Sequence, residues 1–138
     1  MRCPKCGKDS LNAFGMMEGV HVEFCSGCKG IWFDEGELAF YTEMPEDVPD
    51  VGKAVASGRK TDLPCPKCAD QSLVEVKYVA GEKLLLDVCP TCRGVFVDKG
   101  EIPQIERLSV RYRGAESVLT VAKQLEAKGY RILGVQKA

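Results

Sequence analysis

The 138-residue sequence lacks several features that would narrow its function at once. It has no apolar run approaching the roughly 18 residues that a membrane-spanning helix needs. Its first residues, MRCPKCGK, have no apolar core of the kind that a signal peptide carries. Its formal net charge is only −1 at pH 7, which does not indicate a nucleic-acid-binding protein. These absences favour a cytoplasmic protein without a membrane-spanning segment.

Groups suited to catalysis are also scarce. His21 is the only histidine, and Leu85 takes its place in the second copy of the repeat described below. We therefore interpret His21 as an ordinary strand residue rather than a functional one. The sequence also shows no motif of paired acids and no glycine-rich loop. We expect a protein that is not an enzyme.

Cysteine, in contrast, is abundant. The eight cysteines fall only in C-x-x-C pairs, an arrangement that cross-linking by disulfides does not require. In a chain that is not exported, such pairs are typical of metal sites. The predicted metal ligands are Cys3, Cys6, Cys25, Cys28, Cys65, Cys68, Cys89 and Cys92.

The spacing of the pairs predicts two zinc sites. The intervals between paired C-x-x-C knuckles are 18 residues (7–24) and 20 residues (69–88), within the spacing range of zinc-binding sequences. Four thiolates fill every position of a tetrahedral zinc ion, whereas a catalytic zinc keeps one position open. We therefore predict two structural zinc ions per chain. Disulfides or unliganded thiols are one alternative, and iron in four-sulfur electron-transfer sites is another.

The knuckles belong to an internal repeat. CPKCGKDSL at 3–11 matches CPKCADQSL at 65–73, and VHVEFCSGCKGIWFDEGEL at 20–38 matches LLLDVCPTCRGVFVDKGEI at 84–102. The offsets are 62 and 64, so the second copy has two extra residues, which suit a hairpin turn. The predicted organisation is a first zinc ribbon with its exit helix at 1–42, a linker at 43–63, a second ribbon at 64–102 and a C-terminal extension at 103–138.

Each copy predicts a small antiparallel β unit followed by a helix. Apolar and polar residues alternate over 74–78 and again over 84–88, as expected for half-buried strands. Asp34 and Glu37, like their counterparts Asp98 and Glu101, have the spacing of a helix-capping box. The predicted fold class is a metal-stabilised α+β protein with two tandem three-stranded zinc ribbons. Ribbons shorter than about 40 residues need such a metal in order to fold.

The combined motif is similar to a known family. CPxC followed by C-x-x-C-x-G-[IV]-[WF]-[FV]-D-x-G-E-[LI] resembles the TFIIB-type zinc-ribbon family of bacterial proteins, and both copies carry it. The resemblance implies a zinc-ribbon fold with the eight cysteines as ligands. It does not assign a role to the protein.

The extension at 103–138 lies outside that resemblance. Its pattern predicts a helix at Pro103–Arg111, an amphipathic helix at Ala115–Lys128 and a strand at Tyr130–Val135. A lone strand needs a partner, which a ribbon sheet or a second subunit could supply. Residues 104–138 contain seven Lys or Arg and three Glu, a net charge of +4.

Three sets of residues allow two interpretations each. Trp32 and Phe96 could pack in the ribbon or form exposed platforms for bases or a partner peptide. Glu23 and Asp87 could form one acidic stripe or an ordinary solvated strand face, and we favour the solvated face. The knuckle cations could stabilise the thiolates or be ordinary turn residues. These cations are Lys5, Lys29, Lys67 and Arg93.

These observations predict a zinc-binding protein that acts as a protein-interaction or regulatory module. Its partner would be another protein, or a second copy bound through the C-terminal extension. The alternative is binding of nucleic acid or the transcription machinery through the ribbon aromatics and the basic tail.

Overall fold

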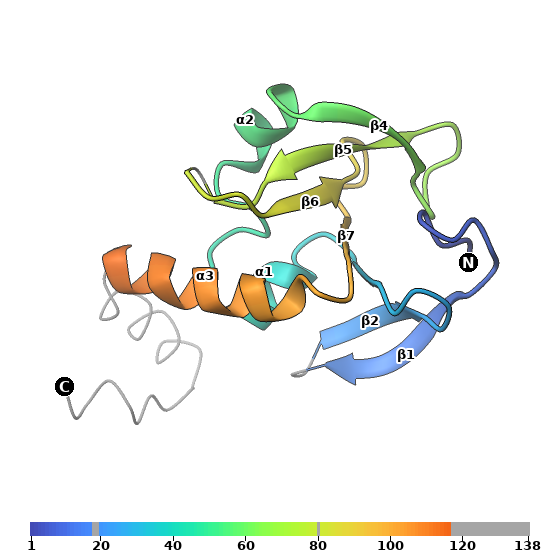
Figure 1. Cartoon of the computed structure of the whole chain (residues 1–138), viewed down its shortest axis with the longest axis horizontal. Helices are drawn as coiled ribbons and strands as arrows, with labels where there is room; N and C mark the ends of the chain where they lie inside the picture. Colours follow the sequence, from blue (N-terminus) through green and yellow to red (C-terminus); the bar gives the residue numbers. More distant parts are fainter. Residues whose placement is uncertain (18–19, 80, 117–138) are drawn as a thin grey trace.

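A computed structural model describes residues 1–17, 20–79 and 81–116, with side chains for all of these except 13–21 and 113–116. Within this part of the chain, seven strands form one antiparallel sheet in the order β1-β2-β3-β7-β6-β5-β4 (Figure 1). The strands are β1 Leu11–Met17, β2 Val20–Cys25, β3 Ile31–Phe33, β4 Arg59–Pro64, β5 Ser72–Lys77, β6 Leu85–Val88 and β7 Val95–Val97. The helices are α1 Glu37–Thr42, α2 Val51–Ala56 and α3 Ile102–Glu116. The predicted fold class, a small metal-stabilised α+β fold with an antiparallel sheet, is confirmed.

The two copies of the repeat are joined through their shortest strands. β3 of the first copy pairs antiparallel with β7 of the second, and Trp32 lies opposite Phe96 at the centre of this seam. On either side of the seam lie the β1–β2 hairpin and the β5–β6 hairpin (Figure 1). The ribbons therefore form one continuous sheet, and their mutual orientation is fixed by the β3–β7 register.

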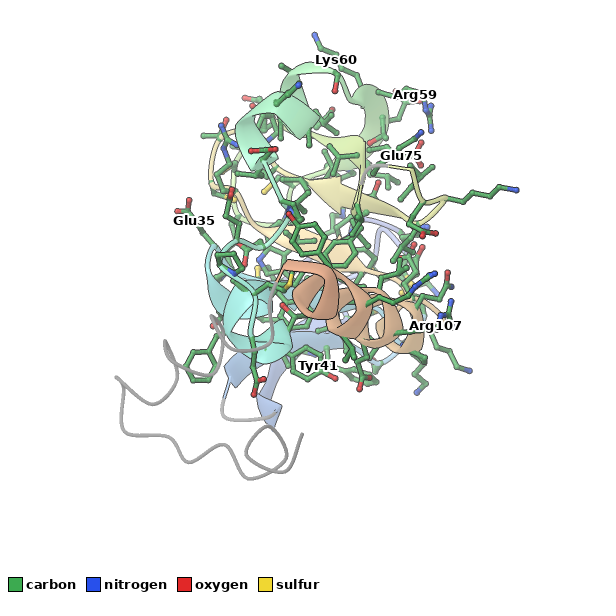
Figure 2. All side chains as sticks on the ribbon, turned by 90° about the vertical axis from the view of Figure 1, so that its left-hand side faces the viewer. Glu35, Tyr41, Arg59, Lys60, Glu75 and Arg107 are labelled. Atoms are coloured by element: carbon green, nitrogen blue, oxygen red, sulfur yellow. The ribbon has the colours of Figure 1, made fainter. Side chains whose placement is uncertain are left out.

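The sheet is covered differently on its two faces. Phe33, Val95 and Val97 belong to one buried cluster, together with Leu38 of α1 and Ile105 of α3. The alternate residues of the same strands, Trp32 and Phe96, belong to a second cluster that contains cysteines of both knuckle sets. Side chains point alternately to the two faces along a strand, so one face packs on helices and the other on the metal knuckles. Outside these clusters, charged side chains such as Glu35, Lys60 and Arg107 extend from the ribbon into solvent (Figure 2).

The segment predicted as a linker, 43–63, is ordered. It contains α2 and most of β4, and β4 pairs with β5 through Arg59 and Glu75, with an irregularity further along the strand. Asp47 is buried, and its carboxylate accepts N–H groups of Gly36 (2.7 Å) and Ala39 (2.8 Å) at the start of α1. The prolines and acids of this segment were interpreted as linker composition, but one of the acids caps a helix.

The extension begins as a single helix. α3 starts at Ile102, one residue before the predicted start at Pro103, and it contains the predicted helix Pro103–Arg111. Pro103 occupies the first turn, where its missing N–H leaves no helical bond unmade. The rest of the predicted helix Ala115–Lys128 beyond Glu116, and the predicted strand Tyr130–Val135, lie outside the described residues.

Candidate metal centres

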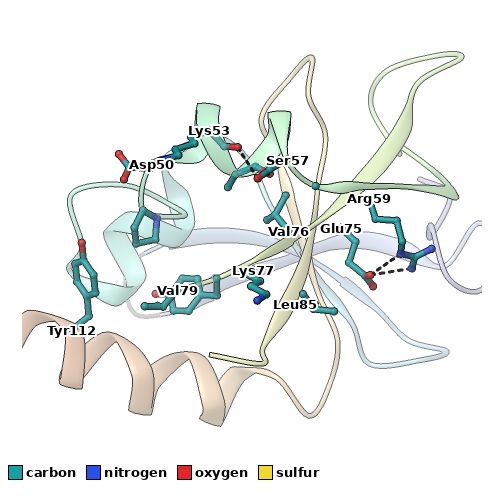
Figure 3. Close-up of a pocket in the computed structure, with 14 residues that line it drawn as sticks. Asp50, Lys53, Ser57, Arg59, Glu75, Val76, Lys77, Val79, Leu85 and Tyr112 are labelled. Atoms are coloured by element: carbon teal, nitrogen blue, oxygen red, sulfur yellow. Dashed lines mark hydrogen bonds and ion pairs between the residues drawn. The ribbon is translucent and has the colours of Figure 1, made fainter. Parts of the chain in front are cut away.

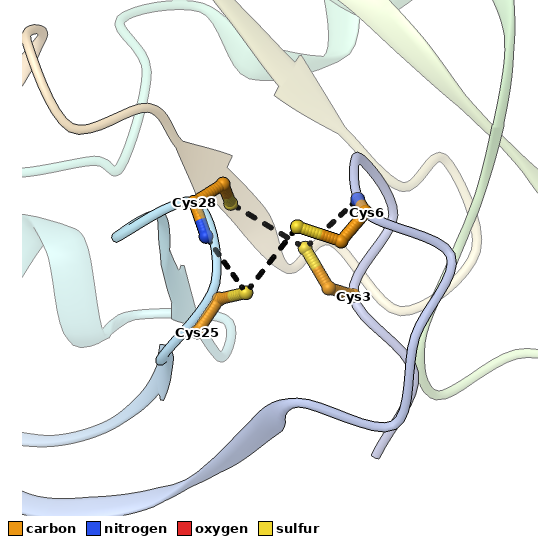
Figure 4. Close-up of side chains that lie close together, drawn as sticks. All are labelled: Cys3, Cys6, Cys25 and Cys28. Carbon is orange, nitrogen blue, oxygen red and sulfur yellow. Dashed lines mark hydrogen bonds between the residues drawn. The ribbon is translucent and has the colours of Figure 1, made fainter.

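The first four cysteines converge from two knuckles at one end of the β1–β2 hairpin (Figure 4). The Sγ atoms of Cys3 and Cys28 are 3.7 Å apart, and those of Cys6 and Cys25 are also 3.7 Å apart. A disulfide bond would bring two sulfurs to about 2.05 Å. All eight cysteines of the chain are free thiols in this structure, so the disulfide alternative is not what the fold contains.

The sulfur positions fit zinc. A tetrahedral zinc ion with Zn–S bonds of about 2.3 Å places its sulfurs about 3.8 Å apart. In the second set, the Sγ atoms of Cys65 and Cys92 are 3.8 Å apart. Within each set, all four ligand atoms lie within 4.8 Å of one another. Cys3, Cys6, Cys25 and Cys28 would hold one ion, and Cys65, Cys68, Cys89 and Cys92 the other.

Each knuckle is a tight turn that directs an amide to a sulfur. The N–H groups of Cys6, Cys28, Cys68 and Cys92 donate to the sulfur three residues earlier, at 3.4, 3.4, 3.3 and 3.4 Å. After the second knuckle of each set, Lys29 and Arg93 adopt positive φ angles of 68° and 63°. This left-handed step turns the chain from the knuckle into β3 or β7. The amide donors partly neutralise the thiolates, which favours ionised sulfur and hence metal.

Burial and hydrogen bonding act on the thiols in opposite directions. Burial raises the pKa of Cys3 to about 12 and that of Cys65 to about 11. Burial also opposes ionisation of Cys25, but the Ser10 hydroxyl, 3.1 Å from its sulfur, and the Cys28 amide outweigh it and lower the pKa to about 6. Thiols with high pKa values release protons when they bind metal, so zinc affinity at both sites depends on pH.

The knuckle lysines contact the opposite half of the chain. Lys5, between Cys3 and Cys6, places its Nζ 2.7 Å from Oδ2 of Asp98. Lys67, at the matching place in the second copy, lies 2.6 Å from Oδ1 of Asp34 and 3.1 Å from Oε1 of Glu23. These contacts raise the pKa of Lys67, against the effect of burial. The two lysines were predicted either to stabilise thiolates or to be ordinary turn residues, and they instead cross the seam to carboxylates.

Lys67 also explains an acidic cluster. Carboxylate oxygens of Glu23, Asp34 and Glu37 lie within 4.8 Å of one another, as in a metal site, but the Lys67 ammonium supplies the positive charge. At the position in β6 that matches Glu23, Asp87 is only 7% exposed, and burial raises its pKa to about 6. The prediction that Glu23 and Asp87 form a solvated strand face is therefore wrong for Asp87.

Trp32 and Phe96 are buried in the seam. Both are 0% exposed. A Cβ added to Gly94 would lie 2.1 Å from Cζ2 of Trp32, and one added to Gly30 would lie 2.3 Å from Cζ of Phe96. Each ring therefore covers the glycine that follows the other copy's second knuckle. The packing interpretation is correct, and neither ring is an exposed platform.

The aspartate and the glutamate of the D-x-G-E motif in each copy have different roles. Oε1 of Glu37 accepts the Asp34 N–H at 2.7 Å, and Oε1 of Glu101 accepts the Asp98 N–H at 2.8 Å, as the capping box predicts. The aspartate side chains do not complete the box. The Asp34 carboxylate instead accepts the indole N–H of Trp32 at 3.0 Å, beside its contact with Lys67. Sequence reasoning missed the Lys67 contact because it joins the two halves of the chain, whereas the bond from Trp32 is local.

Two predictions concern features outside the metal sites, namely His21 and the absence of a membrane-spanning segment. The backbone of His21 lies in β2 opposite Met16, and its side chain lies outside the described part of the structure. In the described residues, no helix is both long and apolar enough to span a membrane.

Comparison with known proteins identifies the family. Searches among curated proteins and among solved structures return no match. The sequence profile of the transcription factor zinc-finger family, a TFIIB-type zinc ribbon, matches residues 2–43 and again residues 64–107. These two segments cover more than half of the chain and contain all eight clustered cysteines. The chain belongs to the transcription factor zinc-finger family, with two tandem zinc ribbons that each bind one zinc ion.

Proposed function

We propose that the protein is a two-zinc scaffold that binds an acidic segment of a partner protein and catalyses no reaction. The proposal rests on one feature outside the metal knuckles, a hollow of about 640 Å³ beside β5 (Figure 3). Ligand-binding hollows in proteins commonly have this volume. The zincs support the fold that shapes it, because four thiolates leave no open metal position for a substrate or water.

The hollow is apolar at its floor and basic at its rim. Val76 and Val79 from the strand side and Pro49 from the loop before α2 contribute apolar surface. Lys53 of α2 and Lys77 of β5 also line it, and neither forms an ion pair within the described residues. An acidic segment that carries one or two apolar side chains complements this surface in both charge and polarity.

Three other charged residues line the hollow, and one of them, Asp50, adds a negative charge. Arg59 forms an ion pair with Glu75 at 2.9 Å, so these two residues contribute little net charge. Tyr112 of α3 closes one side of the hollow. Leu85, at 38% exposure, extends the apolar surface toward solvent. Three cations (Lys53, Arg59 and Lys77) and two acids (Asp50 and Glu75) line the hollow, which leaves a net charge of +1 (3 − 2).

The test is fluorescence anisotropy with two short labelled peptides. One peptide has acidic residues around a central Leu-Phe pair, and the other has lysine at the acidic positions. We expect the zinc-loaded protein to bind the acidic peptide, and a Lys53→Glu/Lys77→Glu variant to bind it at least tenfold more weakly. A matched Lys60→Glu/Arg107→Glu variant, altered at exposed positions that do not line the hollow (Figure 2), should bind normally. Equal binding of both peptides, or no effect of the Lys53 and Lys77 changes, would contradict the proposal.

Nucleic-acid binding is the second candidate. Its remaining support is the +4 charge of residues 104–138, since Trp32 and Phe96 are buried and offer no surface for stacking. Titration of the full chain with a labelled single-stranded oligonucleotide at low and high salt separates the two candidates. Binding that falls steeply with salt supports this second role, and no binding at low salt excludes it. The same samples, analysed by native mass spectrometry, report whether the chain self-associates.

A further inference from the structure

We propose that the two zinc sites load as a coupled pair, because each knuckle set is completed by a lysine contact and an aromatic ring from the opposite half. This inference rests on the two-zinc scaffold proposed above and concerns how that scaffold forms. It assigns positioning roles to Lys5, Lys67, Trp32 and Phe96, none of which supplies a metal ligand.

The first exchange is electrostatic. Lys5 and Lys67 are both held inside a C-x-x-C turn, and each reaches carboxylates of the other copy. The backbone of such a turn is fixed by the metal that joins its two sulfurs. Loss of zinc from one set therefore releases the lysine that neutralises the acids of the other copy. For the second copy these acids include Asp98, which directly follows β7.

The second exchange is steric. Gly30 comes two residues after Cys28, and the Phe96 ring from the other copy covers it. Gly94 comes two residues after Cys92 and is covered by Trp32 in the same way. The two rings share one buried cluster with Cys3, Cys25, Cys65 and Cys89. The second knuckle of each set therefore packs against an aromatic ring of the other copy. That ring lies on the short strand that follows the other copy's own second knuckle.

The seam that carries both exchanges is too short to be stable by itself. β3 and β7 have three residues each, and a pair of such strands needs further packing to persist in water. That packing comes from the knuckles and rings on one face and from the helices on the other. An ordered first site consequently stabilises the seam, and an ordered seam positions the knuckles of the second site. Such coupling is reciprocal and commonly changes affinity by about tenfold.

The first test measures metal stoichiometry by native mass spectrometry during zinc titration of the metal-free protein. We expect clearly less one-zinc species at half-saturation in the wild type than two independent sites of equal affinity would give. A Lys5→Met/Lys67→Met variant should still bind two zincs at saturation but should accumulate the one-zinc species. The control Lys8→Met/Lys60→Met removes the same charge at exposed positions away from the seam. Abundant one-zinc species in the wild type, with no change in the variant, would overturn the coupling while leaving the two-zinc scaffold intact.

A second test locates the effect. In a Phe96→Leu variant the lost ring belongs to the second copy but covers Gly30 of the first. Under a mild chelator, we expect alkylation to reach Cys3, Cys6, Cys25 and Cys28 several-fold faster than in the wild type. A purely local role for Phe96 predicts faster alkylation of the second set instead, and that result would refute the exchange. Failure of peptide binding with coupled loading intact would refute only the proposed partner.

Discussion

The two copies of the repeat contribute matching residues to one face of the sheet and unequal sets of residues to the other. On the metal face, the buried residues match copy for copy: Cys3, Leu11, Cys25 and Trp32 correspond to Cys65, Leu73, Cys89 and Phe96. On the helical face, among the described side chains, the second copy and α3 supply most of the cluster, and the first copy supplies Val22, Phe33 and Leu38. A tetrahedral metal imposes one geometry on both copies, whereas the segment that follows each ribbon determines how its helical face is covered.

The largest expected effect comes from removing either metal site. Structural zinc contributes about 10–16 kcal/mol of apparent binding free energy in small modules. Cys3→Ser/Cys6→Ser and Cys65→Ser/Cys68→Ser should each abolish one zinc, as native mass spectrometry would show. The second variant should lose more structure by NMR and circular dichroism, because the second copy as a whole (residues 64–102) supplies most of the helical-face cluster.

Equal loss of structure in both cysteine variants would contradict this asymmetry. It would show that the seam between β3 and β7 makes the whole chain a single cooperative unit. Retention of two zincs in either variant would contradict the assignment of the ligands. A Ser10→Ala variant, which removes only a hydroxyl near Cys25, should keep both zincs and serves as the control.

Substitutions at Gly30 and Gly94 should disrupt the packing of the metal face. Gly94→Ala would place a methyl group 2.1 Å from Trp32, and Gly30→Ala would place one 2.3 Å from Phe96. We expect each to lower the free energy of unfolding by about 1–3 kcal/mol, as overpacking does. The larger cost should fall on Gly94→Ala, because Trp32 is also held by its hydrogen bond to Asp34.

Urea unfolding of the zinc-loaded proteins measures these costs. The control is Gly52→Ala in α2, where an added Cβ meets nothing within 4 Å. This change should raise stability slightly, because alanine favours the helix more than glycine does. Glycine variants at the seam that unfold like the wild type would mean that the rings can move aside without cost.

Much of the metal face was predictable from sequence, because it follows from local spacing. The C-x-x-C pairs and the contact from Glu37 to the Asp34 amide each depend on residues close in the chain. The seam was not predictable. The pairing of Trp32 with Phe96, and of Lys5 with Asp98 across 93 residues, follows from how the two copies meet. No periodicity within one copy encodes that meeting.

On the helical face, the alternation along β5 and β6 was predictable, but the contacts made by segments outside the repeat were not. Asp47 reaches back to the start of α1 from a segment whose composition resembled a linker. β4 extends the sheet beyond β5, although its alternation is broken by exposed charges and ends at Pro64. Edge strands commonly carry such residues, so the same composition is compatible with a linker or with an edge strand.

Asp47 distinguishes the start of α1, the helix after the first ribbon, from the start of α3, the helix after the second ribbon. Its carboxylate accepts two N–H groups at the start of α1, whereas α3 has Pro103, which needs no acceptor. Asp47→Ala should lower the free energy of unfolding by about 1–2 kcal/mol, a typical cost for a lost helix cap. Asp62→Ala, at an exposed position of β4, should change it little, and urea unfolding compares the two.

The smallest expected effect is a pH dependence that is larger in the second ribbon than in the first. Burial, then the nearby carboxylates of Asp98 and Asp87, outweigh the Asp98 amide and raise the pKa of Glu101 from 4.5 to about 7. The folded protein therefore holds this proton between these two pH values, whereas the unfolded chain does not, so the contribution of Glu101 to stability falls as pH rises through that window.

Glu101→Gln keeps an oxygen acceptor for the Asp98 N–H and removes the titration. With zinc in excess, the variant should gain stability relative to the wild type, by less than about 1 kcal/mol because the group is partly exposed, as pH rises to about 7. Glu37→Gln, in the first ribbon, should show a smaller change because Glu37 is less deeply buried than Glu101, so burial raises its pKa less. Identical pH profiles for the Glu101→Gln variant and the wild type would show that solvent screens this carboxylate fully.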